Sequence, residues 1–510
     1  MSKPRVAIIG AGASGLTCIK QCLADDLEPV CFEAFSTTGG LWRYTEVDEE
    51  NKDPHSSIYK SVIINTSKEN STFSDFPIPP DWPYFMHNKF VAKYFDLYAE
   101  RFQLIPHIKF NTTVLNASIL PDKRWKVRYV TKGEDETESV FDYVMVCTGH
   151  HRYPRLPKYE GMDKFKGIQI HSHFYREPTD FKNKRVVIVG CGNSGMDISV
   201  ELSENASQAY ICVRHGTLPW IVPRLVNGKP IDHLNSRFLI YWLPQFIQNY
   251  LTKYTSKSTI GPAPPGLEPK VEPSSHHPTM KTNFYERLST GTLVVKPNIS
   301  QLNEDGSIEF VDGTKVENID AVIYATGYQI DFPFLDRDIV CDKDVLKDFE
   351  EEYKENLVWL YKRMFPPKYP NIAFIGLVQL IGAIFPLSEM QARYVTSLIK
   401  GYLPPHPPIP EMHKEIRERQ KYLQKVFYKA PRHTIEGYFY PDIDYLAKDL
   451  GCYPYPLQII RKYGLSLYLK ILFGIPNSIQ YRLLGRQSWD GAADAIRVYN
   501  GCEPSKIKQS

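Results

Sequence analysis

Two glycine-rich segments could each hold a phosphate group. Gly10-Ala11-Gly12-Ala13-Ser14-Gly15 lies near the start of the chain, and Gly190-Cys191-Gly192-Asn193-Ser194-Gly195 lies much further along it. In a GxGxxG turn the first glycine permits the tight bend, the second lets the backbone approach a pyrophosphate, and the third lets the next helix pack closely. The N-terminus of that helix then faces the anion. The two segments therefore predict two dinucleotide-binding sites.

The residue at the end of the following strand predicts which dinucleotide each site prefers. After the first turn it is Glu33, whose carboxylate can accept hydrogen bonds from a ribose with a free 2′-hydroxyl, as in FAD or NAD. After the second turn the equivalent residue is Val213, and Arg214 follows it. A guanidinium can bind a phosphate through two hydrogen bonds, so Arg214 favours NADPH over NADH. The alternative is that Arg214 is only a solvated surface charge.

Two different dinucleotides in one chain predict electron transfer from NADPH to a flavin. The nine cysteines include no CxxC pair and no metal-ligand spacing, so we expect neither the dithiol acceptor of the disulfide reductases nor a metal site. Oxygen is then the natural acceptor of the electrons.

The elements that position these residues follow a repeated order of strand, turn, helix and strand. The first copy has strands at 5–9 and 29–33, and the second has strands at 185–189 and 209–213. Two further apolar strands end in a glycine, at Val144 to Gly149 and at Ala321 to Gly327. Each of them is expected to close a Rossmann-like sheet.

This order predicts an α/β fold with two Rossmann-like dinucleotide-binding domains, the NADP domain being inserted in the FAD domain. The expected boundaries are 1–160 and 320–440 for the FAD domain, 161–319 for the NADP domain and 441–510 for a C-terminal cap. A proline-rich and aromatic stretch at about 225–289 is expected to form a helical insertion in the NADP domain. Ser388 and Gln391 have the spacing of a capping box, which predicts a helix start.

Composition favours small molecules as partners. The 510 residues carry 61 Lys and Arg against 58 Asp and Glu, and the net charge of +3 gives no reason to expect nucleic-acid binding. The chain has no signal-peptide pattern and no run of about 18 apolar residues, so we expect a cytoplasmic protein. Two apolar segments, Phe238 to Leu251 and Leu465 to Phe473, could lie on a membrane surface or pack as core or homodimer-contact helices.

Several motifs resemble those of the flavin-containing monooxygenase family, of the animal and fungal type. The most specific is Phe165-x-Gly167-x-x-x-His171-x-x-x-Tyr175, which matches the signature that precedes the second nucleotide fold in that family. The related Baeyer–Villiger enzymes usually have Trp where this chain has Tyr175, which favours heteroatom oxygenation. Animal members typically end in a hydrophobic tail that holds them on the endoplasmic reticulum, whereas this chain ends in Ser505-Lys506-Ile507-Lys508-Gln509-Ser510. Peripheral contact with that membrane is therefore the alternative to a soluble enzyme.

The resemblance implies that NADPH reduces FAD, that O2 adds at flavin C4a, and that the hydroperoxyflavin oxygenates an amine or a sulfide. Asn65, in the segment Asn65-Thr66-Ser67-Lys68, matches the family's active-site asparagine. The other cofactor-binding residues implied by the matching motifs are Gly40, Leu41, Trp42, Thr66, Gly149, Ser194, Gly195, Met196, Asp197, Gly327 and Gln379, besides the turns, Glu33 and Arg214. Gln379 is expected to end a strand that runs toward the flavin. The alternatives are Baeyer–Villiger oxidation of ketones and an uncoupled NADPH oxidase that produces H2O2.

Overall fold

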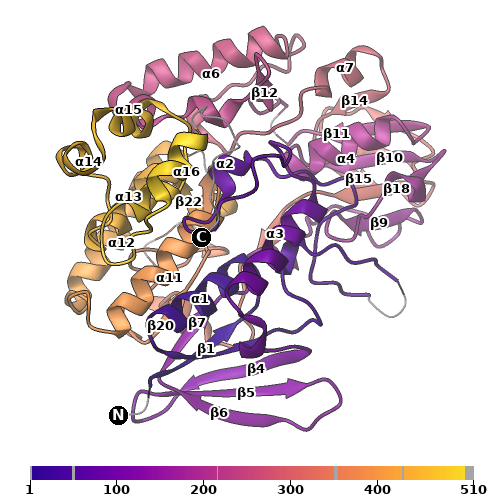
Figure 1. Cartoon of the computed structure of the whole chain (residues 1–510). Coiled ribbons are helices and arrows are strands. Elements are labelled where there is room, and N and C mark those ends of the chain that lie inside the picture. The colour runs from indigo at the N-terminus through magenta and orange to yellow at the C-terminus, as the bar shows by residue number, and fades with distance from the viewer. Residues whose placement is uncertain are drawn as a thin grey trace.

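Two parallel five-stranded sheets form the framework of the molecule (Figure 1). The computed structural model describes residues 3–48, 52–214, 216–347, 349, 354–427 and 430–499. The first sheet has the order β20-β7-β1-β2-β3, with β1 (Arg5–Ile9), β2 (Glu28–Phe32), β3 (Ile108–Lys109), β7 (Tyr143–Val146) and β20 (Ile372–Phe374). The second has the order β14-β11-β10-β18-β9, with β9 (Ile168–His171), β10 (Arg185–Val189), β11 (Gln208–Cys212), β14 (Leu293–Lys296) and β18 (Ala321–Tyr324).

The two halves repeat one plan, which confirms the predicted α/β architecture. Each central strand leads through a glycine turn into a helix, α1 (Ala13–Ala24) after β1 and α4 (Asn193–Ser203) after β10. Each half also carries a three-stranded antiparallel sheet, β4-β5-β6 in the first (Thr112–Ile119, Trp125–Thr131, Thr137–Phe141) and β15-β16-β17 in the second (Ile299–Leu302, Ile308–Phe310, Lys315–Val316). All strands of the second sheet lie between β7 and β20 in the chain, so the second domain is inserted in the first.

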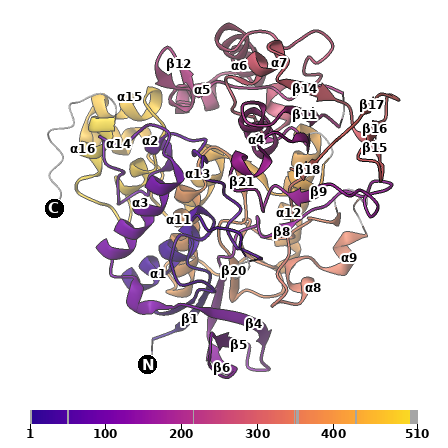
Figure 2. The same cartoon turned by 90° about the vertical axis from the view of Figure 1, so that its right-hand side faces the viewer.

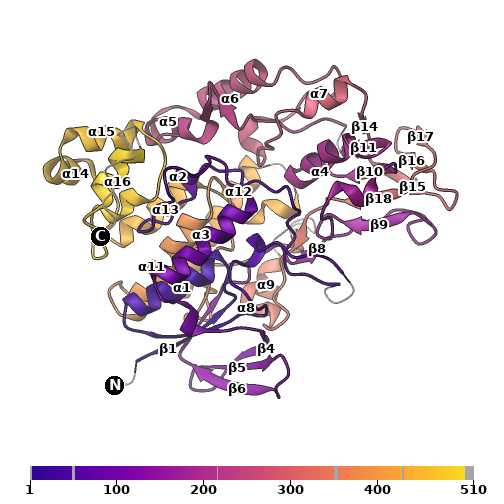
Figure 3. The same ribbon diagram turned by 45° about the vertical axis from the view of Figure 1, so that its right-hand side comes forward.

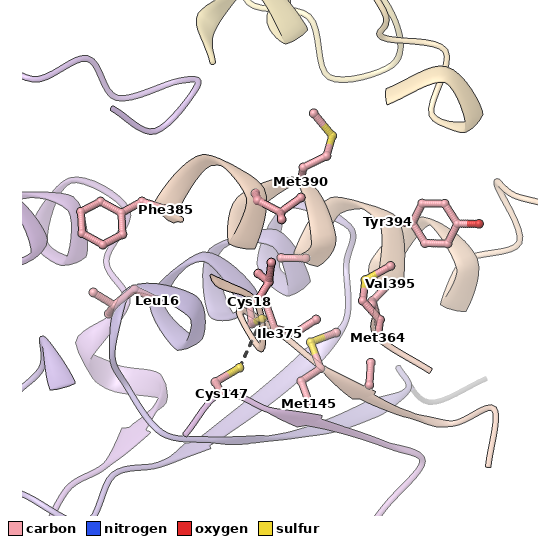
Figure 4. Close-up of a cluster of buried hydrophobic side chains, with 14 of the residues drawn as sticks. Leu16, Cys18, Met145, Cys147, Met364, Ile375, Phe385, Met390, Tyr394 and Val395 are labelled. Carbon is pink, nitrogen blue, oxygen red and sulfur yellow. Dashed lines mark hydrogen bonds between the residues drawn. The ribbon is translucent and has the colours of Figure 1, made fainter. Parts of the chain in front are cut away.

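The central strands are continuously apolar because both faces of each sheet are covered. In β1, Val6 and Ile8 join one hydrophobic cluster with α1 and α11 (Phe385–Ile399), whereas Ala7 and Ile9 join another with β4 and β5. Figure 4 shows the first cluster, in which Leu16 and Cys18 of α1 lie between the strands and the residues of α11. The burial of α1 on both sides fixes the glycine turn from which it begins.

The chain passes between the two sheets at a single pair of short strands. β8 (Tyr153–Pro154) leads into the second sheet, β19 (Tyr328–Gln329) leads out of it, and the two pair antiparallel. Figure 3 shows β8 between the two sheets. β18 belongs to the second sheet, so the domain boundary expected at residue 320 falls after β18.

The insertion contains the hairpin β12-β13 (Leu225–Val226 and Lys229–Pro230) and the helices α5 (Arg237–Trp242), α6 (Gln245–Thr259) and α7 (Phe284–Ser289). The last helices of the described chain are α13 (Phe439–Asp449), α14 (Pro456–Tyr463), α15 (Leu465–Phe473) and α16 (Ala492–Tyr499). Helix α5 of the insertion packs against α15, as Figure 2 shows, and it also contacts α13. The Arg237 guanidinium donates two 2.7 Å hydrogen bonds to the Asp444 carboxylate, and both side chains are buried. The C-terminal helices therefore contact the insertion as well as the first domain, and residues 500–510 of the expected cap lie outside the described residues.

Two further observations concern helices. The helix start predicted at Ser388 is wrong, because α11 begins at Phe385 and Ser388 lies buried inside it. Among the described residues, no helix combines the length and the apolar character that crossing a bilayer requires.

Candidate functional site

A cavity of about 1940 Å³ is lined by residues of both glycine turns. Sites for a single small ligand usually measure about 300–1,000 Å³, so this space is large enough for two ligands. These predicted residues line it: Gly10, Gly12, Ala13, Ser14, Glu33, Gly40, Leu41, Trp42, Asn65, Thr66, Gly149, Gly190, Gly192, Asn193, Ser194, Gly195, Asp197, Arg214, Gly327 and Gln379. The folding of the chain thus brings together residues that are far apart in the sequence.

Both turns have the backbone geometry that a pyrophosphate cradle requires. Gly10 has φ +99°, and a Cβ there would lie 2.9 Å from the carbonyl oxygen of Cys147. Gly190 has φ +107°, and a Cβ there would lie 2.5 Å from the carbonyl oxygen of Ala325. Neither α1 nor α4 has a side-chain cap at its N-terminus, which leaves first-turn N–H groups free for an anion. The residues present therefore fit two dinucleotides.

Glu33 is buried at the end of β2, beside the first turn. Its carboxylate accepts hydrogen bonds from the backbone N–H groups of Ala11, at 2.6 Å, and Phe35, at 3.0 Å. Burial raises the pKa of the Glu33 carboxyl, although these backbone hydrogen bonds act in the opposite direction. The carboxylate is thereby held in one orientation at the wall of the cavity, where a ribose hydroxyl can donate to it.

Arg214 lies just beyond β11, exposed at the wall of the cavity and beside the second turn. No ion pair joins its guanidinium to a residue in the described part of the chain. The side chain is therefore free to bind a phosphate, as its position after the strand predicts.

Three predicted residues do not line the cavity. The backbone N–H of Ala11 is used by Glu33, and Gly15 packs against the turn itself, where a Cβ would lie 1.9 Å from the carbonyl oxygen of Gly10. Met196 is fully buried in the hydrophobic cluster of the second sheet. Ala11 and Gly15 thus shape the cradle from behind, and Met196 packs the helix onto its sheet.

Asn65 lies in the loop before α2 (Lys68–Ser71), and its side-chain oxygen Oδ1 is buried. This oxygen has no hydrogen-bond partner among the described residues. A buried polar atom without a partner costs roughly 1–3 kcal/mol, so its presence at the wall of a ligand cavity indicates a bound partner. The neighbouring Thr66 is fixed by a 2.7 Å hydrogen bond between its hydroxyl and that of Ser71.

Gln379 begins β21 (Gln379–Ile381), so the expectation that it ends a strand is wrong. The strand that precedes it, β20, stops at Phe374, and the intervening segment turns at Gly376. The backbone N–H of Gln379 donates to the carbonyl of Ile435 at 2.9 Å. Gln379 nevertheless lines the cavity, and its contact with the flavin stays a prediction.

Comparison with known proteins identifies the chain. The family model described as "Flavin-binding monooxygenase-like" matches residues 3–503. The chain belongs to this family. It is a flavin monooxygenase with FAD and NADPH as cofactors, and it acts on a small molecule and O2.

Relatives and solved structures agree with this assignment. Flavin-containing monooxygenase 5 of Mus musculus is 41% identical, over 97% of this chain and 92% of its own length. Dimethylaniline monooxygenase [N-oxide-forming] 2 of Macaca mulatta is 39% identical, over 96% of this chain and 91% of its own length. The structure of S-allyl-L-cysteine S-oxygenase from Allium sativum has a TM-score of 0.64 and 26% identity, and the match covers 88% of each chain.

The flavin monooxygenase site also contains residues that the sequence did not suggest. The Arg224 guanidinium donates to the carbonyl of Ile64 at 2.8 Å, and the Asp232 carboxylate accepts from the backbone N–H of Ser67 at 2.7 Å. Both residues belong to the insertion and hold the loop that carries Asn65. No local pattern could reveal Arg224 and Asp232, because they are about 160 residues away in the sequence from the loop that they hold.

Asp197 joins the two domains of the flavin monooxygenase at the cavity. Its carboxylate accepts a 2.8 Å hydrogen bond from the Tyr59 hydroxyl and lies 2.9 Å from the Lys281 ammonium group. Tyr59 comes from the first domain, whereas Asp197 comes from α4 of the second. The predicted cofactor contact of Asp197 is therefore combined with a structural role.

Proposed function

We propose that this flavin monooxygenase oxygenates the nitrogen or sulfur atom of small soft nucleophiles. The observation that carries the proposal is the single cavity that both glycine turns and the buried, unpartnered Asn65 oxygen share. A space of this kind can hold an electron donor, a flavin and a substrate together. The names of two similar proteins, an N-oxide-forming and an S-oxygenating enzyme, support nitrogen and sulfur as the target atoms.

Reduced FAD, when bound, supplies the two electrons that activate O2. The residues of the chain bind and orient the two cofactors, and they exclude water. The two turns hold the pyrophosphates, Glu33 fixes the adenosine end of FAD, and Arg214 binds the 2′-phosphate of NADPH. The Asn65 amide offers two N–H donors and one acceptor where flavin and nicotinamide would meet. Because the lone pairs of neutral amines and of sulfides are themselves nucleophilic, the chemistry needs no activated protein nucleophile of the Ser-His-Asp kind.

Apolar residues keep the site dry. Ile64, Leu218 and Ile435 line the cavity and are buried. Exclusion of water prolongs the life of a reactive oxygen species and prevents its loss as H2O2. Asn65 stabilises the same species through hydrogen bonding.

The test measures NADPH consumption, H2O2 release and oxygenated product with a thioether, a tertiary amine and a cyclic ketone in parallel. We expect sulfoxide and N-oxide to account for most of the NADPH, and lactone for little of it. Asn65→Ala should retain FAD and release a larger share of the electrons as H2O2. If the H2O2 yield equals NADPH consumption and does not change when thioether is added, the enzyme is an oxidase. If lactone is the main product, it is a Baeyer–Villiger enzyme.

We further propose a cytoplasmic enzyme whose helices α5, α6, α14 and α15 rest on an anionic membrane surface. Phe246, Tyr250 and Tyr254 lie on one side of α6 at intervals of four residues, and all three are exposed. Leu457 of α14, which is 83% exposed, and Phe473 of α15 add apolar surface. The four helices contain Lys and Arg but no Asp or Glu, and this combination favours anionic lipid.

A further inference from the structure

A buried carboxylate without hydrogen bonds lies behind the cavity. Glu436 begins the strand β22 (Glu436–Tyr438) and is 0% exposed. Neither of its carboxylate oxygens has a hydrogen-bond partner among the described residues. An ionised carboxylate in such a place is costly unless a positive charge compensates it, so a cationic neighbour would stabilise the charged form of Glu436.

The neighbour that can supply this charge is His277 of the insertion. Its ring nitrogen Nδ1 lies 3.6 Å from Oε2 of Glu436, slightly beyond hydrogen-bond distance. The His277 side chain is 23% exposed and lines the cavity, whereas Glu436 does not. The imidazole therefore stands between the buried carboxylate and the space where substrate must bind.

The position of Glu436 in its strand places this pair beside known parts of the site. β22 pairs with β21 in parallel, and Glu436 is the register partner of Gln379. Gln379 and Ile435 both line the cavity. A carboxylate behind an imidazole, with the far ring nitrogen toward a ligand, is an arrangement in which the imidazole can accept a proton.

We propose that His277 and Glu436 accept the proton of cationic amine substrates. This inference rests on the proposed nitrogen oxygenation and concerns how the enzyme handles those amines that are protonated in neutral solution. Such an amine has no free lone pair until its N–H proton leaves. His277 acts on the substrate directly, and Glu436 is a positioning residue that acts through His277.

The proton transfer balances without any further reagent. The N–H bond of the ammonium substrate breaks, its electron pair stays on nitrogen, and a new N–H bond forms at Nε2 of His277. The imidazolium then faces the Glu436 carboxylate through Nδ1–H, which closes the 3.6 Å gap to a charge-assisted hydrogen bond. After the product has left, the imidazolium gives this proton to solvent, which reaches the partly exposed His277 side chain. A thioether carries no such proton and needs none of these groups.

Two other titratable groups near His277 and Glu436 are poorly suited to accept the substrate proton or to neutralise Glu436. His151 faces His277, but burial, followed by the positive charge of His173 and His277, lowers the pKa of His151 to about 4. Arg363 lies against Gly437, yet its guanidinium is paired with Asp442 at 2.9 Å.

Two further titratable groups, His276 and Tyr438, lie close to the pair in the described part of the chain. His276 directs its Nδ1 to the carbonyl of His277 at 2.8 Å. Burial, with the nearby Tyr422 and Glu436, raises the pKa of Tyr438, so its hydroxyl stays neutral near pH 7. Among the described residues, the cationic partner within 4 Å of the Glu436 carboxylate is His277.

The experiment compares benzyldimethylamine with benzyl methyl sulfide, which have similar shapes and differ in whether a proton must leave. At pH 7 we expect Glu436→Gln to lower kcat/KM for the amine by about 100-fold, within the range for loss of general base catalysis. The sulfide should change by less than about threefold in kcat/KM. The amine defect should shrink as the pH approaches the pKa of the amine, because free amine then enters the site already deprotonated.

His277→Gln gives a second test. It should also lower kcat/KM strongly for the amine and only slightly for the sulfide. Glu436→Asp, which keeps the charge, should recover part of the amine activity. Equal losses for amine and sulfide in both variants would mean a structural role, and unchanged amine kinetics in a variant with full FAD content would also overturn the proposal. Failure of the wild-type enzyme to oxygenate either compound would instead refute the proposed function.

Discussion

At the scale of single residues, the two glycine turns differ in the charge that follows the next strand. The carboxylate of Glu33 lies beside the first turn. The guanidinium of Arg214, which has no ion pair with the described residues, lies beside the second turn. A carboxylate repels the 2′-phosphate that distinguishes NADPH from NADH, whereas a guanidinium attracts it.

Arg214→Ala is therefore expected to raise the KM for NADPH by about 10- to 100-fold, which corresponds to the roughly 1.5–3 kcal/mol of a hydrogen bond to a charged group. The KM for NADH should stay the same, because NADH has no 2′-phosphate. Steady-state kinetics with both nucleotides measures the effect. Arg214→Lys keeps the positive charge but loses the paired N–H donors of the guanidinium. Its KM for NADPH should therefore lie between those of the wild type and of Arg214→Ala. An equal rise for NADPH and NADH would remove the assignment of Arg214.

Single residues were predictable where their neighbours in the sequence define them. Both turns, Glu33 and Arg214 follow from the order of strand, turn, helix and strand, and Asn65 follows from a motif. Asp232 and Glu436 gave no such signal, since each acts on a segment more than 150 residues away. Their roles depend on tertiary packing.

At the scale of elements, three segments meet at the N-terminus of α1. Gly376, in the segment after β20, has φ +75°, and a Cβ there would lie 2.3 Å from the Ser14 hydroxyl oxygen and 2.9 Å from that of Ser388. The two hydroxyls are joined by a 3.1 Å hydrogen bond, and the backbone N–H of Gly376 donates to Gln391 at 2.8 Å. The segment thus links α1 to α11 directly behind the first cradle.

We expect Gly376→Ala to lower the FAD content of the purified enzyme and its melting temperature, because the added methyl group must displace the Ser14 and Ser388 hydroxyls and break the hydrogen bond that joins α1 to α11. Gly401→Ala is the matched control, since Gly401 has φ +71° but no heavy atom within 4 Å of the added Cβ. Both variants bear the backbone cost of roughly 1–3 kcal/mol, and only the first bears the steric cost. Absorbance of bound flavin and thermal unfolding distinguish them. Equal behaviour of the two variants would show that the close approach is unimportant.

The helix start predicted at Ser388 failed for a related reason. Ser388 and Gln391 have the spacing of a capping box, but their side chains contact Ser14 and Gly376 instead. A local pattern cannot distinguish a cap from a contact between elements.

At the scale of the whole molecule, basic and apolar helices gather on one face. Within the face formed by α5, α6, α14 and α15, the ring of Phe238 in α5 contacts that of Phe473 in α15, at 5.0 Å between centroids. Phe246, which is 71% exposed, projects from this face.

We expect the enzyme to float with vesicles that contain phosphatidylserine and to remain in solution with purely phosphatidylcholine vesicles. Replacing Phe246 and Tyr250 together by Ser should reduce flotation about tenfold, given the loss of the buried apolar area. Sulfide oxygenation in solution should be unaffected, because neither residue lines the cavity. A concentration-dependent dimer that the double variant abolishes, with no flotation, would assign the face to a second copy of the chain instead.

The repeated sheets could be predicted because each is built from short segments with their own strand and turn signals. The position of the helical insertion could also be predicted, but its internal fold and its contact with the C-terminal helices could not. The buried pair of Arg237 and Asp444 joins residues 207 positions apart, and neither belongs to a motif.

The paired strands β8 and β19 place the entrance and the exit of the second domain next to each other. A domain connected in this way can be removed or exchanged as a unit, because the two chain ends left in the first domain lie next to each other. Chimeras that carry the corresponding segment of a relative should therefore leave the first sheet intact. Transfer of the coenzyme domain would require only two cuts in the gene, at codons whose residues are neighbours in the folded protein.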